Sequence, residues 1–103
     1  MQPNDAIQRL NQEWKLDITA PQLRHWERYG LIGEVKKNKS GNREYTEDNY
    51  IRIKTVILGK AVGFPNHKIK MLIDGDEFVK REALNLLETT ASILIPEWKE
   101  MLR

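Results

Sequence analysis

The sequence of 103 residues contains no cysteine, which excludes disulfide bonds, thiolate metal sites and a cysteine nucleophile. It has only two histidines, His25 and His67, which fall in separate predicted elements. It also lacks a glycine-rich phosphate loop and any paired metal motif. No apolar run approaches membrane-spanning length, and the first residues do not form a signal peptide. We therefore expect a cytoplasmic protein with no catalytic centre, cofactor, metal site or membrane segment.

The length suits one compact domain with a modest core, and such a domain has little room for a deep substrate cleft. Hydrophobic residues make up 40% and aromatic residues 8% of the chain, which is typical of a folded protein. Internal repeats and low-complexity tracts are absent.

The net charge of +2 is unevenly distributed. Residues 1–60 carry 11 Lys/Arg and 8 Asp/Glu, whereas residues 61–103 carry 6 and 7. Between 36 and 39 there are three lysines, Lys36, Lys37 and Lys39, and Arg43 follows without an intervening acid. A local basic patch fits phosphate binding, and a solvated lysine-rich loop is the alternative.

Two helices joined by a short turn are predicted in the first thirty residues. The first begins near Asn4 or Asp5 and carries an apolar face that includes Leu10. In the second, Thr19 can cap the helix and Gln22 can complete a capping box, while Gly30 can end it. This is the helix-turn-helix arrangement.

The second helix has two distinct faces at 100° per residue, and Leu23 and Trp26 point inward together. The opposite face carries polar and aromatic residues, namely Pro21, Arg24, His25 and Arg28, with Gln22 and Tyr29 at its sides. Such a face suits a major groove, in which arginine reads guanine edges or binds phosphate. An ordinary solvated helix surface is the alternative.

Residues 34–45 read as a hairpin, because Ser40, Gly41 and Asn42 suit a tight turn. A third helix follows with Thr46 as its cap and ends at Gly63, and its inward stripe comprises Tyr50, Ile53, Ile57 and Ala61. A short fourth helix runs from Pro65 to just before Gly75. The predicted fold is mainly α, a winged helix-turn-helix of four to five helices with a small two-stranded β wing.

The predicted division is a DNA-binding domain at residues 1–75 and a C-terminal helical segment at 76–103. The last helix extends from Asp76 to about Ile95, where Pro96 breaks or bends it. Apolar residues alternate there at spacings of three and four, and they are Leu84, Leu87, Ala91, Leu94, Trp98 and Met101. The first four are candidates for a homodimer seam. The alternative is a stripe that folds back onto the chain's own core.

Three separated motifs resemble the MerR family of bacterial regulators. They are ITAPQLRHWE at 18–27 followed by YGLI at 29–32, SGNREYT at 40–46, and GFP at 63–65 followed by Ile69, Leu72 and Ile73. The family typically shows Leu-Arg-aromatic-aromatic-Glu and then Gly-Leu, with Ser-Gly-x-Arg-x-Tyr in its wing. The resemblance covers roughly residues 5 to 75.

The resemblance implies sequence-specific binding of double-stranded DNA and a role in transcription regulation. It also implies that the protein is associated with the nucleoid. Arg24 and His25 would contact DNA from the recognition helix at 19–29, and Arg43 would hold a phosphate from the wing at 34–45. Trp26 and Tyr45 would be structural. The candidate DNA-binding residues are Thr19, Gln22, Arg24, His25, Arg28, Lys36, Lys37, Lys39 and Arg43.

Two departures from the family pattern stand out. His25 replaces the first of the two usual aromatic residues. In addition, the sequence shows no effector domain or metal-binding cysteines after Pro96, so the family's habit of activating promoters by twisting DNA in response to a ligand is not carried over to this chain. Other functions remain open, namely an excisionase-like or architectural DNA-binding factor, or a winged-helix adaptor that binds protein.

Overall fold

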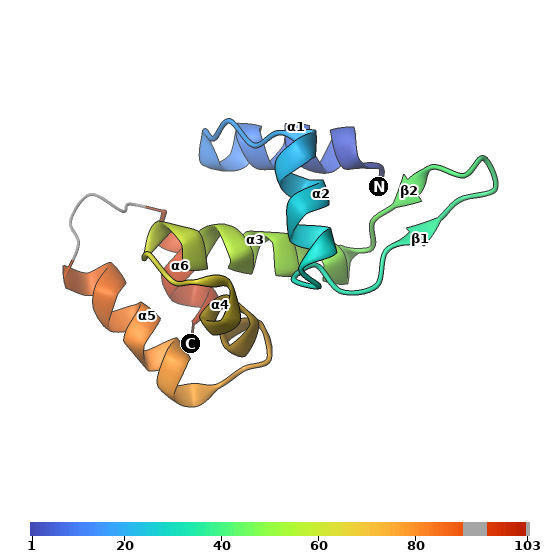
Figure 1. The fold of residues 1–103 in the computed structure, drawn as a ribbon. Coiled ribbons are helices and arrows are strands. Elements are labelled where there is room, and N and C mark those ends of the chain that lie inside the picture. The colour runs from blue at the N-terminus through green and yellow to red at the C-terminus, as the bar shows by residue number, and fades with distance from the viewer. Residues whose placement is uncertain (90–94, 103) are drawn as a thin grey trace. The chain divides into compact units, whose positions relative to one another are not determined.

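The computed structural model describes residues 1–89 and 95–102 (Figure 1). The elements follow the order α1 (Pro3–Trp14), α2 (Ala20–Arg28), β1 (Lys36–Lys37), β2 (Arg43–Glu44), α3 (Glu47–Ala61), α4 (Asn66–Ile73), α5 (Glu77–Thr89) and α6 (Pro96–Met101). The chain divides into two compact packing units, residues 1–53 and 54–103, which we call unit 1 and unit 2. The predicted mainly α, winged helix-turn-helix fold is confirmed.

The helix-turn-helix of unit 1 is defined by the signals at its ends. Asp5 accepts a hydrogen bond from the backbone of Gln2 at the start of α1. The backbone N–H of Thr19 donates to Gln22 Oε1 at 2.9 Å, as the capping box predicts. Gly30 has φ of +73°, a left-handed conformation that glycine adopts without strain, and α2 ends two residues before it, at Arg28.

The wing is an antiparallel hairpin in which Lys36 pairs with Glu44 and Lys37 with Arg43. It extends beyond the helices of unit 1 (Figure 1). The end of the second strand is held at the backbone, because Tyr45 N–H donates to the Met1 carbonyl at 2.6 Å and the Met1 nitrogen donates to the Tyr45 carbonyl at 2.7 Å. This pairing joins the segment before α1 to the base of the wing.

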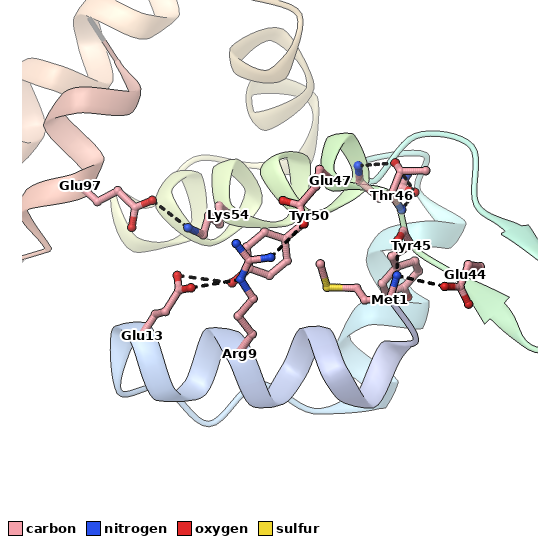
Figure 2. Close-up of polar contacts among 11 residues, drawn as sticks. Met1, Arg9, Glu13, Glu44, Tyr45, Thr46, Glu47, Tyr50, Lys54 and Glu97 are labelled. Carbon is pink, nitrogen blue, oxygen red and sulfur yellow. Dashed lines mark hydrogen bonds and ion pairs between the residues drawn. The ribbon is translucent and has the colours of Figure 1, made fainter.

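Helix α1 is tied to the first turns of α3 by a polar cluster around Arg9 (Figure 2). The Arg9 guanidinium contacts Glu13 on its own helix at 3.1 Å and Glu47 on α3 at 3.0 Å. It also lies 4.2 Å from the centre of the Tyr50 ring. Tyr50 is itself buried beneath this contact, so the arginine stem covers apolar surface while its charge is neutralised.

The core of unit 1 is built from one face of each helix and the residues that follow α2. Its largest buried side chains are Leu10, Trp14, Leu23, Trp26, Leu31, Ile32, Tyr45, Tyr50 and Ile53. The inward direction predicted for Leu23 and Trp26 is therefore confirmed.

Unit 2 packs the second half of α3 with α4, α5 and α6. A Cβ at Gly59 of α3 would lie 2.7 Å from Ile69 Cγ1 of α4, so glycine permits the close approach of these two helices. Lys68 on α4 pairs with Glu82 on α5 at 2.8 Å. The Lys54 ammonium, which is almost buried, contacts Glu97 of α6 at 2.7 Å (Figure 2).

The sequence predicts a last helix that Pro96 breaks or bends near Ile95, and residues 90–94 of that helix lie outside the described residues. The described part of the fifth helix ends at Thr89, and Pro96 is the first residue of a sixth helix. Proline suits the first helical turn, where its missing N–H is not needed, so it starts a helix here and does not bend one. Ala61, predicted on the inward stripe of α3, is exposed.

Candidate nucleic-acid interface

Helix α2 presents the predicted polar face to solvent. Arg24, His25 and Arg28 are exposed, on the side opposite the buried Leu23 and Trp26. The exposed side chains therefore stand on a short helix whose orientation is set by two buried anchors.

The side chains of Thr19 and Gln22 have a structural task at the start of this helix. Gln22 Oε1 accepts from the Thr19 backbone and lies 3.2 Å from Thr19 Oγ1. Both residues are exposed. The capping box fixes Gln22 Oε1 toward the helix start, and any contact with DNA would be made by the remaining donors of this pair.

An aromatic pair extends the exposed face to the end of α2. The rings of His25 and Tyr29 lie 4.8 Å apart and are tilted by 60°, and Tyr29 is 56% exposed. Tilted stacking of this kind limits the freedom of both rings. The histidine that departs from the family pattern thus keeps an aromatic neighbour at the surface.

The tip of the wing is organised by Asn38, which sequence analysis did not single out. Asn38 Oδ1 accepts from the backbone N–H of Ser40 at 2.9 Å and of Asn42 at 3.0 Å. Gly41 supplies the left-handed turn with φ of +80°. An asparagine before Ser and Gly is the available sequence signal, because Asx side chains bind the backbone two residues ahead.

The base of the wing is fixed by Asn49, a second residue that sequence analysis missed. Its side chain is 2% exposed, and its Nδ2 donates to the carbonyls of Ile32 at 2.9 Å and Glu34 at 3.0 Å. Its Oδ1 accepts from the Thr46 backbone at 2.9 Å. One buried amide therefore joins the exit of α2, the start of the hairpin and the first turn of α3.

Arg43 of the wing contacts α2 directly. Its Nε donates to Glu27 Oε1 at 3.0 Å and Oε2 at 3.2 Å. The hydrogen bond and the charge of Glu27 raise the pKa of the Arg43 guanidinium above its ordinary value. Because Nε carries this contact, the guanidinium is oriented while its terminal amino groups keep their donor capacity.

Tyr45 brings Arg24 into the same cluster. The phenol is buried, and burial together with the nearby charge of Glu27 raises its pKa above the ordinary value, whereas Arg43 and Arg24 act in the opposite direction. Its hydroxyl has no hydrogen-bond partner within the described parts of the chain.

A hollow of about 320 Å³ opens beside these arginines. Its lining combines Arg24 and Arg43 with Asn4, Ala20 and Asn42, so it collects the start of α1, the first turn of α2 and the wing. The first turn of a helix carries partial positive charge. Two guanidinium groups beside such a turn make a site suited to a phosphate group.

Most of the predicted DNA-facing cations of unit 1 have no acidic partner, and Arg43, which pairs with Glu27, is the exception. Arg9 and Arg52 contact carboxylates on α1 and α3. Within residues 1–89 and 95–102, no carboxylate lies within ion-pair distance of five exposed cations, Arg24, Arg28, Lys36, Lys37 and Lys39. Lys15, which follows α1, is also exposed and has no carboxylate within ion-pair distance in the described residues.

The candidate dimer seam is described only in part. Leu84 is half-buried and Leu87 is 5% exposed within its own chain, on the same face of α5 as the buried Val79 and Ala83. Ala91 and Leu94 lie outside the described residues.

Two features of other protein classes are absent from residues 1–89 and 95–102. None of the helices found there is long and apolar enough to cross a membrane. In the same ranges, no three His, Asp or Glu side chains gather as a metal site would require.

A two-helix turn, an exposed basic face on the second helix and a basic hairpin beside it together define a winged helix-turn-helix of the DNA-binding class. Residues 14–76 match the MerR HTH family regulatory protein family. This match spans more than half of the chain, and the protein belongs to that family. Its regulators are DNA-binding proteins of transcription control. Neither the curated proteins nor the solved structures gave a match.

Proposed function

We propose that this protein binds specific sequences in double-stranded DNA, with α2 in the major groove and the wing on the adjacent backbone. The observation that carries the proposal is the group of five unpaired, exposed cations on α2 and the wing. Unpaired cations exchange their counterions for phosphates, and this release drives binding.

Reading of the bases is assigned to α2. Arg24 and Arg28 are exposed arginines one turn apart on a nine-residue helix. Arginine donates two hydrogen bonds to a guanine edge, and such a contact discriminates against other bases by about 1–3 kcal/mol. His25 stands between them in sequence, where either ring nitrogen can meet a base or a phosphate. Thr19 and Gln22 would contribute contacts at the start of the helix.

We assign the contacts with the DNA phosphate backbone to Arg43, to the hollow beside Arg24 and to the wing lysines, which are Lys36, Lys37 and Lys39. Arg43 is already oriented by Glu27, so little side-chain freedom is lost when its amino groups meet a phosphate. The lysines are exposed on flexible stems and suit contacts that ignore sequence.

The test is a fluorescence-anisotropy titration of the full chain with labelled duplexes at several salt concentrations. A selected duplex should bind at about micromolar concentration or tighter, with log affinity falling by about 0.9 per phosphate contact against log salt. Changing Lys36, Lys37 and Lys39 together to Ala should flatten that slope. Changing Lys60, Lys70 and Lys99, which lie in unit 2, should leave it as it was. Absence of binding at low salt would refute the proposal.

Dimerisation on paired half-sites is proposed as the assembly, since a two-fold dimer doubles the contacts of a small domain. Because Leu87 is buried within its own chain, Leu87→Asp would lower fold stability whether or not a dimer forms. The half-buried Leu84 is the better position for a test. Leu84→Asp should abolish cooperative binding to a two-site duplex in analytical ultracentrifugation while single-site binding is retained. A wild-type chain that occupies both half-sites independently would exclude the dimer.

A further inference from the structure

Unit 2 contains a cavity of about 210 Å³ that is open to solvent on one side and that the DNA-binding function does not use. Its apolar walls come from Leu58 on α3, Leu72 and Ile73 on α4, and Leu102 after α6. Leu58, Leu72 and Leu102 are buried, which makes these walls part of the core of the unit.

Two polar side chains also reach the cavity, Thr55 of α3 and Lys80 of α5. The Lys80 ammonium lies 3.7 Å from Glu77 Oε1, which is beyond hydrogen-bond distance, and the Glu77 side chain is 80% exposed. An ammonium has three donors, and this pairing occupies none of them at close range. Lys80 is itself 24% exposed, so its charge lies between the solvent and the apolar walls.

We propose that this cavity binds a small monocarboxylate with a compact apolar body, such as a benzoate-like acid. An apolar cavity of about 150 Å³ is large enough for benzene, so this one accommodates one ring with a carboxyl group. The ring would replace solvent against the half-buried Ile73 and Met101, and the carboxylate would accept from Lys80. A single lysine in the lining suits a ligand with one negative charge.

The experiment is calorimetric and NMR titration of the full chain with three probes that separate charge from ring. Benzoate carries both features, benzyl alcohol keeps the ring without the charge, and acetate keeps the charge without the ring. Benzoate should bind with Kd of about 1 mM or tighter, which is reasonable for a ligand of this size. Benzyl alcohol and acetate should bind about tenfold more weakly, because each lacks one of the two contacts.

Three single substitutions test whether benzoate binds in this cavity. Lys80→Met keeps the apolar stem and should weaken benzoate about tenfold while benzyl alcohol stays within about twofold. Lys70→Met makes the same chemical change at an exposed position of α4 outside the cavity, and it should leave both affinities unaltered. Ile73→Phe fills the cavity from a half-buried position and should remove binding of both aromatic probes.

Several results would overturn the proposal. These are no saturable benzoate binding, equal affinity for acetate and benzoate, or the same benzoate affinity in Lys80→Met and Lys70→Met. NMR shifts confined to Arg24 and Arg43 would place benzoate in the basic hollow of unit 1 and would likewise exclude the cavity. Failure of DNA binding would leave these results intact, because no cavity residue belongs to the proposed DNA-binding set.

Discussion

The contact between Glu27 and Arg43 allows a prediction in which one substitution acts with opposite sign in two backgrounds. Arg43 holds Glu27 through Nε, and the side chains are 37% and 25% exposed. A partly exposed pair of this kind contributes at most about 1 kcal/mol to folding, and less at high salt. Glu27→Gln and Arg43→Ala should therefore change the melting temperature only slightly, and their effects should be read in DNA affinity.

Glu27 acts on a bound phosphate in two opposing ways. It orients the Arg43 guanidinium, and losing that orientation costs up to about 1 kcal/mol of binding. Its carboxylate also repels the phosphate, by about 0.6 kcal/mol at roughly 7 Å in a water-like dielectric. A screening length of about 8 Å reduces this repulsion to about 0.3 kcal/mol. Orientation is the larger effect, so Glu27→Gln should weaken binding by about twofold to threefold.

In the Arg43→Ala background only the repulsion remains. Glu27→Gln should then strengthen binding, by less than about twofold. Arg43→Ala alone should weaken all duplexes about equally, by roughly fivefold, and should reduce the salt slope by about 0.9. Anisotropy titrations of the four proteins complete the double-mutant cycle. If Glu27→Gln tightens binding in both backgrounds, Glu27 does not position Arg43, and if Arg43→Ala has no effect, the wing contact is wrong.

Four further predictions follow from single positions. Arg24→Ala should lower affinity for a selected duplex about tenfold and relax its specificity, whereas Lys70→Ala should not, as competition titrations would reveal. Trp26→Ala should destabilise the fold by about 3–5 kcal/mol, and an unchanged melting temperature would place Trp26 at the surface. Asn49→Ala should cost about 2–3 kcal/mol in urea unfolding, because it leaves buried backbone groups unpaired. Tyr45→Phe should keep or raise stability, since its buried hydroxyl is unpartnered within the described residues. The pKa of Tyr45 is raised in the folded state, so above about pH 10 the unfolded chain loses this proton more readily than the folded one. The wild type should therefore lose stability above about pH 10, and Tyr45→Phe should lose less. Unfolding at about pH 8 and about pH 11 would measure the difference.

The sequence predicted those features that depend on local chemistry. The two faces of α2 follow from the spacing of Leu23 and Trp26, and its ends follow from Thr19 and Gly30. The hairpin follows from a turn around Gly41. Each of these requires only neighbours within a few residues, where helical periodicity and turn preferences are strong.

Features that join distant segments could not be predicted in the same way. Glu27 and Arg43 are separated by 16 positions, and Asn49 binds carbonyls 15 and 17 positions away. Nothing in a single sequence indicates which of 15 acids meets a given arginine. The sequence left open whether Pro96 breaks or bends the last helix, because proline is compatible both with the end of one helix and with the first turn of the next.

The same long-range pairing explains how a protein of net charge +2 can present a basic face. In unit 1, Glu13, Glu47 and Asp48 contact Arg9 and Arg52 on α1 and α3. These three acids and two bases leave a net charge of only −1, so they contribute little to the field at α2 or the wing. Interactions between exposed charges fade over about 10 Å at ordinary ionic strength. A phosphate at the proposed interface is therefore affected mainly by local charges, and the whole-chain sum underestimates the attraction. Asp48→Asn, on α3, should then leave the salt slope of DNA binding unchanged, whereas Arg28→Ala should reduce it.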